Sequence, residues 1–104
     1  MMKFISNCNE LNPKGTSSII EDSNGNVDDK KKGLILDYLK NGIDAGVRCS
    51  VVVDRITGDR LPQTIHRYKD DEYIWTDEDI YHYEKYNIKL FDEFINKVVL
   101  SNPK

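Results

Sequence analysis

The sequence has few of the features that mark secreted, membrane-spanning or redox proteins. Its 104 residues include only two cysteines, Cys8 and Cys49, and neither belongs to a redox motif or to a set with metal-ligand spacing. We therefore expect two free thiols, as in a reducing cytoplasm. No stretch approaches the ~18 consecutive apolar residues of a membrane-spanning helix. Residues 1–11 also lack the apolar run of a secretory signal. The sequence predicts a cytoplasmic protein that does not bind a membrane.

Signatures of catalysis and of cofactor binding are also lacking. The chain has no glycine-rich phosphate loop and no G-x-S-x-G nucleophile motif. Its two histidines, His66 and His82, have no partner at metal-ligand spacing. The acidic residues fall in predicted turns and in the first turn of a predicted helix, where we expect exposure rather than the burial that acid–base catalysis needs. We predict no catalytic residue, no metal, no cofactor and no enzymatic activity; a small metal-dependent enzyme is the least favoured alternative.

What is present is enough for one small folded domain. Hydrophobic residues make up 38% of the chain and charged residues 32%, and the length fits a single core. The formal net charge is −3. A general nucleic-acid binder needs a basic face, so this charge argues against that class. It is compatible with a local acidic surface that attracts a basic partner.

The N-terminal third is weakly patterned. Residues 3–5 could form a short strand, whereas the sequence EDSNGNVDD at residues 21–29 is typical of a turn or linker. We predict a partly flexible, poorly ordered N-terminal arm over residues 1–32 and one domain over residues 33–104.

The rest of the chain alternates between helical and strand periodicity. The predicted elements are a helix at 30–40, strands at 45–55, 63–69 and 72–75, a helix capped by Thr76, and a helix at 90–100. Four apolar residues are expected to share one face of the first strand: Val47, Cys49, Val51 and Val53. Pro62 is expected to lie outside the strand ladder. The predicted fold class is α+β, with an antiparallel sheet of three strands or slightly more packed against helices.

An acidic and aromatic segment is the main functional indication. Residues 68–94 contain eight of the ten aromatic residues, and residues 70–93 contain nine of the eighteen acids. Tyr73, Trp75 and Tyr83 are expected to build the core. The remaining tyrosines and acids are typical of a protein-binding surface, because tyrosine offers rigid contact area and acids steer a basic partner. The predicted partner-binding residues are Asp70, Asp71, Glu72, Asp77, Glu78, Tyr81 and Glu84.

Short motifs within residues 33–99 point to a family. These are Tyr38-Leu39 with Gly42, a valine-rich strand ending at Val53-Asp54, the hairpin sequence YKDDEYIW at residues 68–75, Tyr83 with Tyr86, and Leu90 with Phe94. They resemble the YL-x-x-G, TDG-x-W-x-W, YY-x-x-x-Y and LP-x-x-F motifs of small bacterial immunity proteins from polymorphic-toxin and contact-dependent growth inhibition systems. Asp71 replaces the glycine of the family's turn, Tyr73 its first tryptophan and Phe91 its proline.

The resemblance implies a non-enzymatic inhibitor that binds the C-terminal domain of a cognate toxin. Many toxins of these systems are nucleases with basic active sites, so the implied mechanism is occlusion of such a site by an acidic, tyrosine-rich face. We expect a monomer or a weak dimer with a protein partner and no nucleic acid. A protein-interaction adaptor of another pathway is the alternative, and gene context discriminates between the two, because immunity genes directly follow toxin genes.

Overall fold

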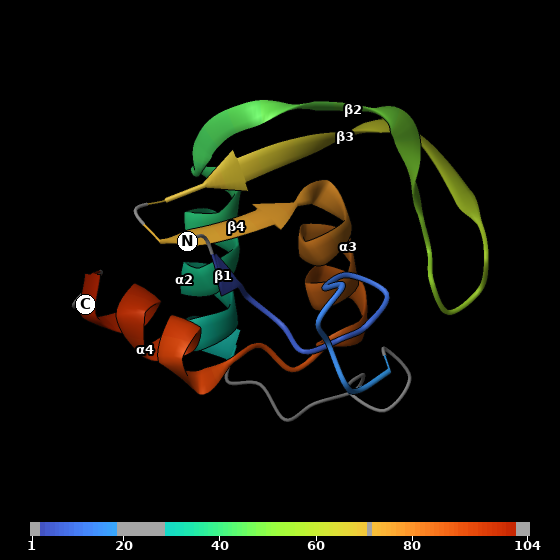
Figure 1. Ribbon diagram of the computed structural model, residues 1–104. Coiled ribbons are helices and arrows are strands. Elements are labelled where there is room, and N and C mark those ends of the chain that lie inside the picture. Colours follow the sequence, from blue (N-terminus) through green and yellow to red (C-terminus); the bar gives the residue numbers. More distant parts are fainter. Residues whose placement is uncertain (1–2, 19–28, 71, 102–104) are drawn as a thin grey trace.

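A mixed sheet forms the centre of the fold in the computed structural model, which describes residues 3–18, 29–70 and 72–101 (Figure 1). The four strands in the described part are β1 (Lys3–Phe4), β2 (Ile43–Val53), β3 (Arg60–Lys69) and β4 (Tyr73–Thr76). Their order across the sheet is β1-β4-β3-β2. The β3 strand is antiparallel to both β2 and β4, whereas β1 runs parallel to β4. The predicted α+β class is confirmed, but the sheet is mixed rather than purely antiparallel.

Three helices in the described part cover the sheet: α2 (Asp29–Lys40), α3 (Asp77–Tyr86) and α4 (Asp92–Ser101). Thr76 caps α3 through a capping box, in which its side chain accepts a hydrogen bond from the Glu78 N–H and Asp79 accepts one from the Thr76 N–H. The helix ends where Asn87 adopts a left-handed conformation with φ 53°. Both ends of α3 are therefore set by local side-chain chemistry, as the sequence predicts.

Aromatic side chains make up much of the core, which lies between the sheet and helices α2 and α4. The rings of Tyr73 and Phe94 meet edge to face with centroids 5.0 Å apart, and the Trp75 ring lies 6.0 Å from Phe94. The Trp75 indole N–H donates to the Leu39 carbonyl at 2.9 Å, which links β4 to α2. Tyr73, Trp75 and Tyr83 are all buried, so their predicted role in the core is confirmed.

The N-terminal segment contributes to this core. Ile5 and Cys8 are fully buried within the core cluster. The Ile5 carbonyl accepts a hydrogen bond from the Phe91 N–H at 2.9 Å, and β1 covers the edge of β4. Residues 3–18 thus differ from the separate arm that the sequence suggests, because burial of Ile5 and strand pairing attach them to the domain. The rest of the expected linker, residues 19–28, lies outside the described residues.

The β2–β3 hairpin reaches beyond the rest of the domain and curves over α3 (Figure 1). Its register shifts three times, so the valines of β2 do not follow simple alternation. Val52 is fully buried and Val47 is exposed, which makes the predicted face of this strand wrong. Pro62 lies within β3 rather than outside the ladder. It is tolerated there because the pairing between Val51 and Val53 is irregular.

Candidate functional site

The seven predicted partner-binding residues do not form one surface. Asp70 and Glu72 lie in the β3–β4 turn, whereas four others are on α3: Asp77, Glu78, Tyr81 and Glu84. Asp71 lies outside the described residues. Most of the described members make hydrogen bonds within the domain.

Asp70 organises the β3–β4 turn. Its Oδ1 accepts hydrogen bonds from the N–H groups of Glu72 and Tyr73 at 2.9 and 2.7 Å. Its Oδ2 accepts from the Tyr38 hydroxyl and lies 3.2 Å from Lys97 Nζ. Burial opposes ionisation, but the hydrogen bonds outweigh it and hold the pKa of Asp70 below its ordinary value. Asp70 therefore stabilises the turn and connects it to α2 and α4, rather than facing a partner.

Glu72 and Glu84 are the exposed acids of the described set. Glu72 pairs with Lys3 at 3.5 Å and Glu84 pairs with Lys40 at 3.3 Å. Their side chains are 47% and 54% exposed. Exposed pairs of this kind contribute little to stability, so both carboxylates remain available to another molecule. They lie apart in the fold, Glu72 in the β3–β4 turn and Glu84 on α3.

Glu78 is buried rather than exposed, contrary to the expectation for a first helical turn. Its carboxylate forms a bidentate pair with Arg55, with the two shortest contacts at 2.9 and 3.2 Å. It also accepts a hydrogen bond from the Val53 N–H at 3.3 Å. Val53 is the last residue of β2 and Arg55 lies in the turn that follows it, so Glu78 links this end of the hairpin to α3.

Asp77 makes the corresponding contact with β3. It accepts hydrogen bonds from the His66 N–H at 2.8 Å and from the Tyr68 hydroxyl at 3.0 Å, and it lies 3.0 Å from His66 Nδ1. Burial, followed by the hydrogen bond to Asp77, raises the pKa of Tyr68 to about 12. The Tyr68 hydroxyl therefore stays protonated and acts as a donor at neutral pH.

Asp54 is a buried acid that the sequence analysis does not single out. Its Oδ1 accepts from the N–H groups of Ile56 and Thr57 at 2.9 and 3.0 Å. Its Oδ2 accepts from the hydroxyls of Tyr81, at 2.7 Å, and Tyr86. Burial would raise the pKa of Asp54, but these hydrogen bonds hold it well below its ordinary value. In the sequence, Asp54 stands directly before a turn that contains Gly58. An aspartate in this position commonly accepts hydrogen bonds from the backbone of the turn, and this pattern could have indicated its role.

His82 completes the contact between α3 and the hairpin. It is fully buried, and its Nε2 accepts a hydrogen bond from the Arg55 N–H at 2.9 Å. Its Nδ1 lies 2.7 Å from the Glu78 carbonyl, so Nδ1 carries the proton in the neutral ring. Burial lowers the pKa of His82.

Nine side chains connect α3 to the hairpin and to the turn that follows β2, and we call them the hairpin clamp. They are Asp54, Arg55, His66, Tyr68, Asp77, Glu78, Tyr81, His82 and Tyr86.

A groove remains open beside the hairpin clamp, between β3, α3 and the end of α2. Its volume is about 250 Å³, and we call it the α3 groove. It brings together three of the predicted residues, Asp77, Tyr81 and Glu84. The other lining residues are Lys40, Gln63, Tyr68 and Ile80. The groove therefore combines two carboxylates and one ammonium group with two tyrosine rings.

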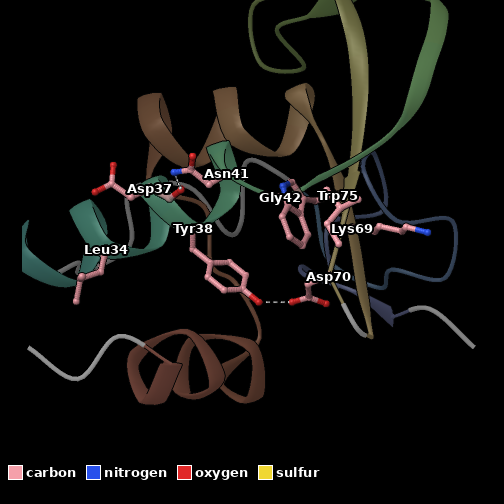
Figure 2. A pocket seen from close by; sticks show the side chains of 9 residues that line it. Leu34, Asp37, Tyr38, Asn41, Gly42, Lys69, Asp70 and Trp75 are labelled. Atoms are coloured by element: carbon pink, nitrogen blue, oxygen red, sulfur yellow. Dashed lines mark hydrogen bonds between the residues drawn. The ribbon is translucent and has the colours of Figure 1, made fainter.

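A second pocket of about 350 Å³ lies where α2 meets β2 and the β3–β4 turn (Figure 2). In it the Tyr38 hydroxyl points at the Asp70 carboxylate, whereas the Lys69 side chain extends away (Figure 2). A Cβ at Gly42 would lie 2.5 Å from Cζ2 of Trp75, so only glycine fits against the indole. The YL-x-x-G motif thus serves packing at the end of α2.

Within the ranges that the structure describes, no group of three or more His, Cys, Asp or Glu side chains is arranged to hold a metal ion. In the same ranges, none of the helices has the length and apolar character needed to cross a membrane.

Comparisons with protein families, with curated proteins and with solved structures found no match to this chain.

Proposed function

We propose that this chain is an immunity protein that binds and neutralises a cognate bacterial toxin, and that the α3 groove contacts the toxin. The observation that carries the proposal is the convergence of Asp77, Tyr81 and Glu84 on one groove with Tyr68. The resemblance of the helix, hairpin and tyrosine motifs to immunity proteins supports the same function. The proposed toxin is a nuclease domain of a contact-dependent growth inhibition or related system.

The chemistry of the α3 groove suits a basic side chain of the toxin. The Asp77 carboxylate accepts hydrogen bonds from the Tyr68 hydroxyl and from the His66 N–H. In the described contacts it pairs with no lysine or arginine. Glu84 has Lys40 as its ion-pair partner, and both side chains are more than half exposed. The two tyrosine rings offer rigid contact area and a favourable surface for a cation. An arginine or lysine from the basic cleft of a nuclease would find opposite charge and aromatic walls here.

Inhibition on this proposal needs no chemical step. The protein covers the cleft in which the toxin binds its polyanionic substrate, and the acids of the groove replace part of the substrate's negative charge. Electrostatic attraction between such surfaces mainly raises the association rate. The hairpin clamp keeps the groove in shape, since Asp77 and Tyr81 both belong to it.

The test is co-expression with the C-terminal domain encoded immediately upstream of this chain. We expect a complex that co-purifies and that protects the host from the toxin domain. Glu84→Gln should lower the association rate several-fold at low salt, with less effect at high salt. Glu72→Gln is the matched control, because Glu72 has similar exposure and also pairs with a lysine but lies outside the groove.

Three outcomes would count against the proposal or part of it. Absence of a complex would overturn the immunity function. A complex without protection from toxicity would favour the adaptor alternative. Equal effects of Glu84→Gln and Glu72→Gln would leave immunity in place and remove the α3 groove as the contact.

A further inference from the structure

A pocket of about 380 Å³ lies between β4, the start of α3 and the segment that follows β1, and we call it the N-terminal pocket. Residues 9–13 of that segment form one wall, and the segment lies beside α3 in Figure 1. The volume is in the range of natural small-molecule sites. None of the lining residues belongs to the α3 groove, so this is a separate candidate site.

Part of the N-terminal pocket is apolar and held in place by the domain itself. The half-buried side chains of Phe4, Leu11 and Ile74 line it. The turn that carries Leu11 is closed by hydrogen bonds from the Leu11 and Asn12 N–H groups to the Cys8 carbonyl, at 3.0 and 2.8 Å. The Asn12 side chain is itself buried. The pocket therefore offers a fixed apolar wall to a hydrocarbon group.

The pocket also contains an arginine without an acidic partner. Arg67 on β3 is exposed and forms no ion pair with the described residues. Its partner in the register is Thr76 of β4, and paired residues of antiparallel strands place their side chains on the same face, about 5 Å apart. Such a guanidinium group can bind a carboxylate through two parallel hydrogen bonds.

The second arginine of the pocket adds a donor but no net charge. The Nε and Nη2 groups of Arg55 donate to the Glu78 carboxylate at 3.2 and 2.9 Å, so the two charges cancel. The Nη1 group makes no hydrogen bond with the described residues and can donate to a ligand. Glu10 also lines the pocket and is already engaged in a contact within the protein.

Asp79 is a buried carboxyl group at the same pocket. It is 5% exposed, and both of its hydrogen bonds, from the N–H and the hydroxyl of Thr76, end on Oδ2. Oδ1 therefore has no partner in the described part of the domain. Burial raises the pKa of Asp79 to about 7, against the hydrogen bonds from Thr76. In its protonated form the group can donate a hydrogen bond to an anion.

Thr76 brings the two groups together. Arg67 is its neighbour across the strands, and Asp79 is hydrogen-bonded to it. A ligand that contacts both groups needs a negative charge for the guanidinium and an oxygen that accepts the carboxyl proton. A carboxylate meets both needs with one charge. The second charge of a phosphate would meet the Glu78 carboxylate without a further unpaired arginine to balance it.

We propose that the N-terminal pocket binds a small organic carboxylate, with its charge on Arg67, a hydrogen bond from Asp79 and its hydrocarbon part on the apolar wall. This site goes beyond the proposed function, because it lies outside the α3 groove and needs no toxin. The structural role of Asp79 does not require an acid, since an asparagine oxygen can also accept the Thr76 N–H.

The test is a titration of the full chain with benzoate, followed by amide chemical shifts at pH 6. Benzoate combines one negative charge with a ring that the apolar wall can contact. We expect saturable shifts confined to residues 4, 9–13, 55, 67 and 74–79. Benzamide, which has a similar shape without the charge, should bind at least about tenfold more weakly, and so should inorganic phosphate.

Substitution of the unpaired arginine tests the charge contact. Arg67→Gln should weaken benzoate binding by about tenfold or more. Lys69→Gln is the matched control, because Lys69 is an exposed cation of the same strand that does not line this pocket. It should leave binding unchanged.

The pH dependence tests the contact with Asp79. The charged groups that line the pocket with it are Glu78 on the same helix, Arg55 after β2, Arg67 on β3 and Glu10 in the wall. Binding to the native chain should weaken about tenfold from pH 6 to pH 8, because the protonated fraction of Asp79 falls by about that factor. Asp79→Asn should bind benzoate equally at both pH values, which separates this effect from titration of the histidines.

Four outcomes would overturn the inference. They are the absence of saturable shifts at the pocket, equal binding of benzoate and benzamide, equal effects of Arg67→Gln and Lys69→Gln, and tighter binding of inorganic phosphate than of benzoate. A pH dependence that persists in Asp79→Asn would overturn the contact assigned to Asp79. Toxin binding through the α3 groove is measured separately, so none of these results alters the proposed function.

Discussion

Asp54 and Tyr86 are 32 residues apart in sequence, and the Tyr86 hydroxyl donates a hydrogen bond to the Asp54 carboxylate. Asp54 directly follows β2, and Tyr86 is the last residue of α3. The same carboxylate oxygen accepts from Tyr81. The buried carboxylate of Asp54 thus connects the end of β2 to α3.

Asp54→Ala should lower the free energy of unfolding by about 2–4 kcal/mol, because it leaves two turn N–H groups and two tyrosine hydroxyls without their acceptor. The measurement is urea denaturation, with hydrogen exchange to locate the change in the β2–β3 hairpin. Asp59→Ala, at an exposed acid of the same turn, is the control and should have little effect. Equal stability of the two variants would show that Asp54 does not hold the hairpin.

The second prediction concerns the glycine of the YL-x-x-G motif. Gly42→Ala should destabilise the fold by about 1–3 kcal/mol, because the new methyl group would overlap the Trp75 ring. Gly33→Ala, in the interior of α2 with no atom within 4 Å of the new Cβ, should instead stabilise by about 0.5–1 kcal/mol. Thermal and urea unfolding of the two variants measure this difference. Stabilisation by both substitutions would contradict the packing role of Gly42.

The third prediction concerns the pH dependence of stability at the start of α3. Burial raises the pKa of Asp79 to about 7. The folded state therefore binds this proton more strongly than the unfolded chain, and the contribution of Asp79 to stability falls as the pH rises from about 4 to about 7. Asp79→Asn keeps an oxygen that can accept the Thr76 N–H but carries no charge.

Across that pH range, the free energy of unfolding of Asp79→Asn relative to the native chain should increase by about 2–4 kcal/mol and then level off. Urea denaturation at a series of pH values gives the curve. Asp92→Asn, in the exposed first turn of α4, controls for the removal of one negative charge. A flat difference between Asp79→Asn and the native chain would mean that the pKa of Asp79 is the same in the folded and unfolded states.

Local patterns predicted the elements of the fold well. The Thr76 capping box, the end of α3 at Asn87 and the helical spacing around Phe94 all depend on neighbours in sequence, and the structure agrees with each. The shape of the sheet depends on more distant contacts. The bulges that expose Val47 arise from its pairing with β3, and the parallel pairing of β1 depends on burial of Ile5. Periodicity within one segment does not report such contacts.

The candidate site was predicted only in part, because charge in a sequence does not show where the charge is used. Asp77, Tyr81 and Glu84 do meet in the α3 groove. Glu78 was expected to face solvent, but Arg55 of the hairpin binds it, and 23 residues separate the two. His82 and Asp54 were missed for the same reason, since each becomes significant only through contacts across the hairpin. An acidic, aromatic segment can stabilise a fold as readily as it can recruit a partner.

The pairing of Arg55 with Glu78 has a consequence for how this protein can evolve. Replacing either residue alone would leave a charge without its partner beneath the hairpin, so we expect the two positions to change together in diverging lineages. Exposed positions outside this pair, such as Val47, Gln63 and Glu84, can vary one at a time. The two positions beneath the hairpin are therefore expected to change rarely and together, whereas exposed positions change independently.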